Sequence, residues 1–385
     1  MISNTATLYL DHAATSAIAP EVHTFFVSLL SQGIGNSSSA HSDGSHALAL
    51  LNNARENVAQ KLGCDPTEIT FTSGGTEGNN WILQRVLEDA ARSDRFKSSR
   101  PHLITSSIEH SSVVSVAQWM KKTGQIDWSE LAVEPDGRVS VQALERMITP
   151  STVLVSIGHG NNEIGTLQDL KGLGDLCRSR GVLFHADACQ TFCHEPFVAR
   201  DLPVDFMVLS GHKIRAPKGV GAVYVRKGLE LTPLLFGGKQ ERGLRPGTTS
   251  VELICAFAKA ASLWTVKDIE RTHAVRNYSI QKLKSAVPGV RFNGPESGPV
   301  LCHVLSFTTP AIHSKALHRE LANAKVSCST GAACGTGLSD SSAVLLGLGR
   351  SPDEAHQIRI SFSPTTEMAT IDTFIDRLTK ILKAL

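Results

Sequence analysis

The chain has 385 residues, of which 41% are hydrophobic and 19% are charged. This length exceeds what one hydrophobic core usually organises, and the composition is too apolar for a disordered chain, so we expect two compact domains. The 38 basic and 36 acidic residues leave a formal charge of +2. A charge this small provides no electrostatic basis for direct binding to nucleic acid or to an anionic membrane.

The start of the chain and the spacing of its cysteines argue against secretion, disulfide bonds and a metal site. The start, Met1 to Asn4, lacks the basic and apolar regions of a secretory signal, and Lys259 interrupts the apolar run 254–258 well before it could span a bilayer. The eight cysteines are Cys64, Cys177, Cys189, Cys193, Cys255, Cys302, Cys328 and Cys334. They form no C-x-x-C pair, which argues against a disulfide framework and against a metal site. We therefore expect reduced cysteines, no metal and a cytoplasmic location.

Helix and strand signals alternate between about residue 45 and residue 225. Leu51, Ala54, Val58 and Leu62 recur at helical spacing and Gly63 follows them, which predicts a helix that ends there. Short apolar runs predict strands at 69–71, 103–105, 153–155, 182–184, 206–208 and 220–223. Such runs, without polar alternation and separated by helix-length segments, indicate a mostly parallel sheet covered on both faces. Ligands of these sheets bind beyond the carboxyl ends of the strands.

The pattern changes after about residue 265, where longer helices replace most strands. Two runs, 304–307 and 358–361, predict strands of a smaller sheet. Apolar residues at helical spacing mark a closing amphipathic helix, namely Ile371, Phe374, Ile375, Leu378 and Leu382. This part of the chain is predicted to form a second, smaller domain.

Unusual polar residues cluster at the ends of the predicted strands. The turn 72–76, Thr-Ser-Gly-Gly-Thr, follows one strand and opens a helix, so free backbone N–H groups face one point and predict an anion site. Asp187 ends another buried strand, where a carboxylate needs a cation or several donors. Lys213 directly follows a third, beside Ser210 and His212, and burial there would turn its amine into a nucleophile towards carbonyls.

Taken singly, each feature also has an ordinary structural explanation: a tight turn, a helix cap and a solvated lysine. Together they match the needs of pyridoxal phosphate. Its aldehyde requires an amine, its pyridine nitrogen a carboxylate and its phosphate a set of donors. The sequence therefore predicts a pyridoxal-phosphate site.

The motifs that surround these residues resemble those of a known family. They are 9–15 (YLDHAAT), 35–41 (GNSSSAH), 73–77 (SGGTE), 161–165 (NNEIG), 210–213 (SGHK), 241–248 (ERGLRPGT) and 358–361 (IRIS). In this order and spacing they are similar to the class V branch of the fold-type-I pyridoxal-phosphate enzymes, and within it to NifS/IscS-type cysteine desulfurases. The resemblance implies an α/β fold with a large cofactor-binding domain over 16–262. It also implies a smaller α+β domain built from 1–15 and 263–385, with a loop at about 327–340 that carries the reactive cysteine.

The resemblance also implies residue roles. Lys213 would carry the cofactor as a Schiff base, Asp187 would pair with the ring nitrogen, and His110 would stack on the ring and move protons. Gln190 and Asn162 would bind the ring hydroxyl region. Gly75, Thr76, Ser210 and His212 would hold the phosphate, together with Thr248 of a second subunit, which implies a homodimer. Arg359, assisted by Asn36, would clamp the substrate carboxylate.

The segment Ser327 to Gly337 distinguishes sulfur chemistry from the other reactions that pyridoxal folds support. Its glycine-rich composition predicts a loop that can move, and the resemblance implies that Cys334 takes sulfur from L-cysteine as a persulfide, releasing L-alanine for later transfer to a sulfur-acceptor protein. Cys328 is predicted to be structural, with a backup thiol as the alternative, and Cys189 is predicted to be a small packed residue.

Three alternatives remain at this point. Selenocysteine lyases share the apparatus, but Ser111 stands where selenium-dedicated members carry an acid. The other two alternatives are a class V aminotransferase in which Cys334 is incidental and a catalytically silent adaptor.

The sequence departs from the family's pattern at three places. Two of them affect packing, namely His12 in the opening motif and the glycines that flank His159. The third is the end of the chain at Leu385, without the tail that IscS-type members use to dock an iron–sulfur scaffold.

Overall fold

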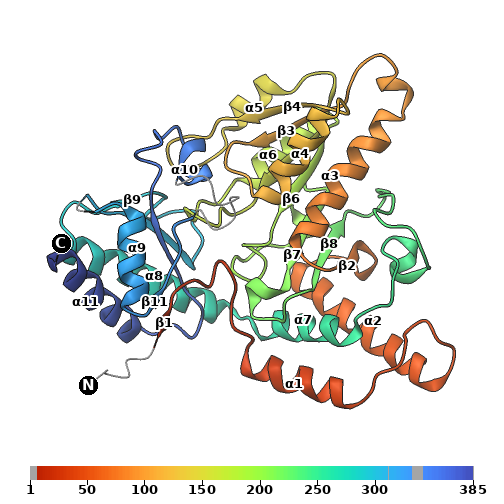
Figure 1. The fold of residues 1–385 in the computed structure, drawn as a ribbon. Helices are drawn as coiled ribbons and strands as arrows, with labels where there is room; N and C mark the ends of the chain where they lie inside the picture. The colour runs from red at the N-terminus through yellow and green to blue at the C-terminus, as the bar shows by residue number, and fades with distance from the viewer. Residues whose placement is uncertain (1–6, 311, 332–340, 385) are drawn as a thin grey trace.

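The computed structural model describes residues 7–310, 312–331 and 341–384, and its larger part is built on a seven-stranded sheet (Figure 1). The strand order is β2 (Ile69–Thr72), β8 (Gly221–Val225), β7 (Phe206–Ser210), β6 (Leu183–Asp187), β5 (Thr152–Gly158), β3 (His102–Ser106) and β4 (Asp127–Leu131). Only β8 runs antiparallel to its neighbours, so the predicted mostly parallel sheet is confirmed.

Helices cover both faces of this sheet. Successive strand residues point to opposite sides, so the apolar strands present a hydrophobic face on each side. Ile104 and Val155 pack on one side, whereas their neighbours Leu103 and Leu154 pack on the other. The first side carries α1 (Pro20–Ser31), α2 (Ser42–Leu62), α5 (Val141–Met147), α6 (Leu170–Ser179) and α7 (Val251–Leu263). The second side carries α3 (Gly75–Ala91) and α4 (Ser111–Lys122). Burying apolar side chains on both faces makes the strands continuous apolar runs rather than alternating ones.

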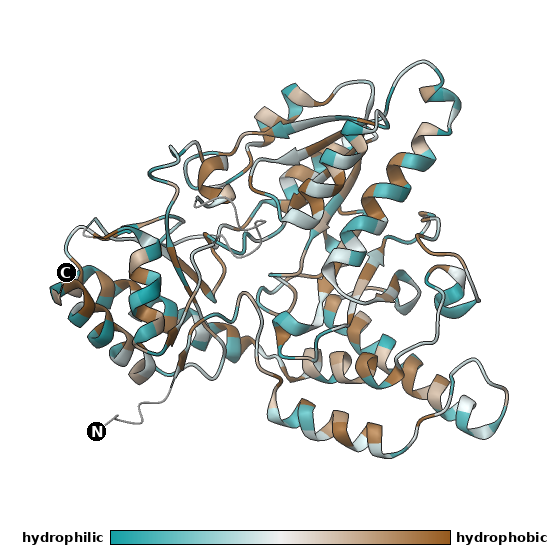
Figure 2. Cartoon of the chain, viewed as in Figure 1, coloured by the Kyte–Doolittle hydropathy of each residue, from teal (hydrophilic) through white to brown (hydrophobic). Residues whose placement is uncertain are grey.

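A smaller sheet lies beside the large one and has its own core. Its strands are β9 (Arg291–Phe292), β10 (Val304–Thr308) and β12 (Ile358–Ser361), and β1 (Leu8–Tyr9) pairs with β11 (Val326–Ser327) next to it. The helices of this part are α8 (Val266–Ala286), α9 (Ser314–Asn323), α10 (Ala343–Gly347) and α11 (Met368–Ala384). Teal and brown alternate around α11 in Figure 2, as expected for a helix with one face on the core and one in solvent.

Short 3-10 helices complete the described part of the chain, namely η1 (Pro66–Glu68), η2 (Asp94–Phe96), η3 (Ala199–Asp201), η4 (Gly211–Ile214) and η5 (Gln240–Gly243). All eight strands predicted from apolar runs are present, as is the closing helix. The proposed domain boundaries, 16–262 against 1–15 with 263–385, remain a prediction. No helix within residues 7–310, 312–331 and 341–384 has the length and apolar character needed to cross a bilayer.

Arg276 of α8 provides a test of how the smaller part is held together. Its side chain is 1% exposed and donates hydrogen bonds to the carbonyl oxygens of Val304, Glu296 and Pro295. We expect Arg276→Met to lower the free energy of unfolding by about 3 kcal/mol, because buried carbonyl groups lose their donors. Arg271→Met on the exposed side of the same helix should change it by less than about 0.5 kcal/mol. Urea unfolding followed by circular dichroism measures both, and equal effects would contradict the assignment.

Candidate active site

A cavity of about 410 Å³ opens at the carboxyl ends of four neighbouring parallel strands. The last residues of β3, β5, β6 and β7, which are Ser106, Gly158, Asp187 and Ser210, all line it. The strands end at the same edge of the sheet because they run parallel. The cavity therefore lies beyond the carboxyl ends of these strands, where the sequence predicts the site.

The anion cradle lies where β2 turns into α3. Gly74 has a φ of +147°, a conformation that side chains rarely adopt, and Gly75 and Thr76 begin the helix with free N–H groups that face the cavity. A Cβ atom on Gly75 would lie 2.6 Å from Sγ of Cys189, so only glycine fits there. Backbone donors at a helix N-terminus, with the helix dipole behind them, favour a phosphate.

His212 lies on the other side of the cavity, directly after β7. Burial, with a further contribution from the Lys213 charge, lowers the pKa of His212 to about 4, so its ring is neutral at physiological pH. Its Nδ1 lies 3.1 Å from Oγ1 of Thr15. A neutral ring in this position can donate one N–H to an anion without adding charge to the cavity.

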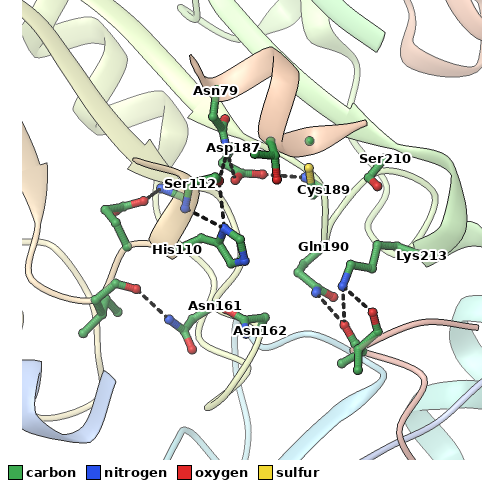
Figure 3. Close-up of a pocket in the computed structure, with 18 of the residues that line it drawn as sticks. Asn79, His110, Ser112, Asn161, Asn162, Asp187, Cys189, Gln190, Ser210 and Lys213 are labelled. Carbon is green, nitrogen blue, oxygen red and sulfur yellow. Dashed lines mark hydrogen bonds between the residues drawn. The ribbon is translucent and has the colours of Figure 1, made fainter. Parts of the chain in front are cut away.

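Asp187 is held by donors from two elements (Figure 3). Its Oδ1 accepts a hydrogen bond from the N–H of Cys189 at 2.9 Å, and its Oδ2 accepts one from Nδ2 of Asn79 at 2.7 Å. Two donors offset part of the cost of placing a carboxylate at a buried strand end. The carboxylate is thereby fixed in one orientation at the base of the cavity.

The same Asn79 is connected to His110 through Ser112. Nδ2 of Asn79 donates to Oγ of Ser112 at 2.8 Å, and that hydroxyl lies 2.8 Å from Nδ1 of His110. The backbone N–H of Ser112 also donates to Nδ1 of His110, at 3.1 Å. Because an N–H group can only donate, Nδ1 is the acceptor and the neutral ring carries its proton on Nε2.

Lys213 lines the cavity from η4, as Figure 3 shows. Its Nζ donates to the carbonyl oxygens of Ala13 at 2.7 Å and Ala14 at 2.8 Å. Gln190 donates to the same Ala13 oxygen at 3.0 Å, and its own Oε1 lies 3.0 Å from Nε2 of His303. The amine and the amide are therefore positioned by one short segment of backbone.

Arg359 reaches the cavity from the smaller sheet, at β12. Its guanidinium donates to Oδ1 of Asp11 at 2.7 Å and to the carbonyl oxygen of Asn162 at 3.0 Å. Its Nε atom is buried and has no hydrogen-bond partner among the described residues. A buried N–H without a partner is costly, so the two hydrogen bonds of the other guanidinium nitrogens hold the side chain in place against that cost.

Ten of the residues predicted from the sequence line this one cavity: Gly75, Thr76, His110, Asn162, Asp187, Gln190, Ser210, His212, Lys213 and Arg359. Two do not. Asn36 is exposed and its Oδ1 accepts the N–H of Ser38, and Thr248 is exposed in the segment that Arg245 ties to Glu77. Cys334 lies outside the described residues, although Ser329 and Gly331, shortly before it, line the cavity.

Sequence reasoning missed Asn79, Ser112 and Glu109. Asn79 follows Gly75 by one helical turn, a spacing that places both on the same face of α3 and that the sequence does contain. Glu109 precedes His110 and accepts hydrogen bonds from Oγ of Ser106 and from the N–H of Gly158. None of these three residues lies at a strand end, which was the signal that pointed to Asp187, Ser210 and Lys213.

Pyridoxal phosphate fits this set of donors. The cavity places an amine, a carboxylate, a neutral imidazole and a helix N-terminus around one space of suitable size. The residues that line the cavity therefore include a partner for each end of the cofactor.

Comparison with known proteins identifies the family. A family model described as aminotransferase class-V matches residues 8–374, and the chain belongs to that family. Members of this family are in general dependent on pyridoxal phosphate.

Within the family the chain groups with the NifS/IscS-type cysteine desulfurases. It is 34% identical over 381 residues to cysteine desulfurase IscS of Clostridium botulinum (strain Kyoto / Type A2), covering 98% of this chain and 94% of that relative. A solved NifS-like protein matches with a TM-score of 0.89 and 32% identity, covering 98% of this chain and 100% of its own. SspA, solved in complex with cysteine, matches with a TM-score of 0.82 and 32% identity, covering 94% and 100%.

Glu109 should make stability depend on pH. Burial raises its pKa to about 7 from an ordinary 4.5, with hydrogen bonds from Ser106 and Gly158 opposing the rise. The folded protein therefore holds a proton that the unfolded chain releases, and stability falls as pH rises from about 4.5 to about 7. We expect Glu109→Gln to remove this loss, which is at most about 3 kcal/mol.

Thermal unfolding at pH 5 and at pH 8 measures the effect. The melting temperature of Glu109→Gln relative to the parent should be higher at pH 8 than at pH 5. Glu130→Gln, at an exposed position of β4, serves as the control and should show no such trend. A constant difference across this range would show that Glu109 is ionised throughout.

Proposed function

We propose that the chain is a pyridoxal-phosphate-dependent cysteine desulfurase that converts L-cysteine to L-alanine and keeps the sulfur as a persulfide on Cys334. The observation that carries this proposal is the convergence of Lys213, Asp187 and Arg359 on one cavity, with Gly331, three residues before Cys334, in its wall. The curated relatives are cysteine desulfurases over nearly the whole chain, which supports the same reaction.

Each residue of the cavity has a distinct part in holding the cofactor. Lys213 would attach it, and Asp187, fixed by Asn79, would pair with the ring nitrogen. His110 would stack on the ring, and Gln190 and Asn162 would bind the ring hydroxyl region. Gly75, Thr76, Ser210 and His212 would hold the phosphate. When bound, pyridoxal phosphate supplies the electron sink that weakens bonds at the α and β carbons of an amino acid.

The protein residues then bind the substrate and move protons. Arg359 binds the carboxylate of L-cysteine, assisted by Asn36. The Lys213 amine removes the α-proton, and Nε2 of His110, which carries a proton in the neutral ring, protonates or deprotonates sulfur.

The sulfur transfer is balanced without any further reactant. The thiolate of Cys334 attacks the substrate sulfur, an S–S bond forms and the Cβ–S bond breaks. The electron pair of the broken bond stays on Cβ, which takes up a proton equivalent to the one that the Cys334 thiol loses on ionising. Cysteine and a thiol thus become alanine and a persulfide, and no external oxidant or reductant takes part.

The proposal also includes a homodimer, a sulfur-acceptor protein and a cytoplasmic location. Thr248 is exposed and lies away from this cavity, which fits a role at the phosphate of a second subunit and hence a homodimer. A sulfur-acceptor protein would collect the persulfide sulfur, in a cytoplasmic location that keeps the thiols reduced. Direct contact with nucleic acid or membrane is not part of this function.

Removing the proposed sulfur acceptor tests the function directly. Cys334→Ala should bind cofactor and change its absorbance with cysteine, but release alanine at a rate lower by at least about 100-fold. The matched control is Cys328→Ala, a buried cysteine that should keep its activity. Mass spectrometry after incubation with cysteine should find one added sulfur on Cys334. Full activity of Cys334→Ala would instead favour a class V aminotransferase.

Arg359→Lys tests the substrate contact. Lysine keeps the charge but loses the planar fork that binds a carboxylate through two N–H groups. We expect KM for cysteine to rise by at least about tenfold, with a smaller change in kcat. Arg291→Lys on β9 of the same sheet is exposed and should leave both constants unchanged. A fall in kcat alone would place Arg359 outside the carboxylate site.

A further inference from the structure

Glu163 is a buried carboxyl group next to the cofactor cavity, in the loop that follows β5. It is 7% exposed and does not line the cavity itself. Its Oε2 atom accepts hydrogen bonds from Oγ of Ser342, at 2.6 Å, and from Nε2 of Gln357. Burial raises the pKa of Glu163, and these two hydrogen bonds oppose the rise. A buried acid with donors this specific indicates a role beyond packing.

The contacts of Glu163 lie at both ends of residues 332–340, the segment that contains Cys334. Ser342 follows this segment by two residues, and Gly331 immediately precedes it. A Cβ atom on Gly331, whose φ is +79°, would lie 2.3 Å from Oε2 of Glu163 and 2.2 Å from Nε2 of Gln357. The backbone at Gly331 therefore rests directly on the Glu163 carboxyl group.

Backbone hydrogen bonds extend this attachment to the rest of the site. Ser329 exchanges hydrogen bonds with Arg359 at 2.7 and 3.0 Å, and the N–H of Gly331 donates to Oγ of Ser329 at 3.1 Å. On the far side, the N–H of Ser342 donates to the carbonyl oxygen of Ala355 at 2.8 Å, and its hydroxyl caps α10. Both ends of the segment are thus tied to elements that already line or support the cavity.

We propose that Glu163 is a positioning residue for sulfur transfer. Through its contacts with Gly331 and Ser342 it fixes the positions of these two residues, between which Cys334 lies in the sequence. This inference rests on the proposed function, since it takes Cys334 as the sulfur acceptor. Glu163 acts through these two ends and touches neither cofactor nor substrate.

Two substitutions separate this role from a general structural one. Glu163→Ala removes the acceptor of both hydrogen bonds. Glu163→Gln retains an oxygen that can take the place of Oε2, which accepts both of them. Two quantities are measured on the cofactor-loaded dimer: the cysteine concentration that half-saturates the absorbance change, and the rate of alanine release with persulfide formation on Cys334.

We expect Glu163→Ala to keep the half-saturating cysteine concentration within about twofold and to lower alanine release by at least about tenfold, because misplacement of a reacting group slows the transfer step. Glu163→Gln should stay within about twofold in both. Equal loss of both readouts in Glu163→Ala, or alanine release at the parental rate, would overturn the proposal.

A second variant decides the matter if Glu163→Ala does not fold. Gly331→Ala keeps the carboxyl group but displaces the backbone that rests on it, and should cause the same selective loss of alanine release. A Gly331→Ala variant with normal alanine release would refute the inference. Cys334→Ala is measured alongside: should it still release alanine, the proposed function fails, whatever the Glu163 variants do.

Discussion

The site depends on placing a carboxylate at the buried end of β6. Asp187 is tolerable there only because donors reach it, and one of them, Asn79, comes from α3. The same helix forms the anion cradle at Gly75 and Thr76, one turn earlier. A single helix therefore sets the separation between the proposed phosphate site and Asp187, the proposed partner of the ring nitrogen. Rigid placement of this kind lowers the reorganisation that a cofactor would otherwise require.

The smaller sheet is coupled to this site through the N-terminal segment. The N–H of Ala13 donates to Oγ of Ser361 on β12, while its carbonyl oxygen accepts from Lys213 and Gln190. Asp11, two residues earlier, pairs with Arg359. One short stretch of chain thus connects Lys213, the proposed point of cofactor attachment, with Arg359 of β12, the proposed substrate contact, so a shift of the smaller sheet would move both.

Strand ends explain what the sequence revealed and what it did not. Asp187, Ser210 and Lys213 stand out because polar residues interrupt apolar runs, whereas Asn79 lies among ordinary polar helix positions and gives no such signal. β4 was missed because it is a partly exposed edge strand, and the antiparallel direction of β8 leaves no mark in a buried apolar run. Thr248 and Asn36 do not line the cavity, and the role proposed for Thr248 involves a second subunit, which no pattern within one chain can place.

The raised pKa values of the other seven thiols support the proposal that Cys334 is the sulfur acceptor. The thiolate is the reactive form, and burial raises the pKa of every cysteine in the described part of the chain. Even Cys189, which lines the cavity, is held protonated by burial and by the neighbouring Asp187. Cys328, six residues from Cys334, has a pKa of about 12. Burial therefore disfavours the ionised form of these seven thiols, which supports the proposal that Cys334 accepts the sulfur.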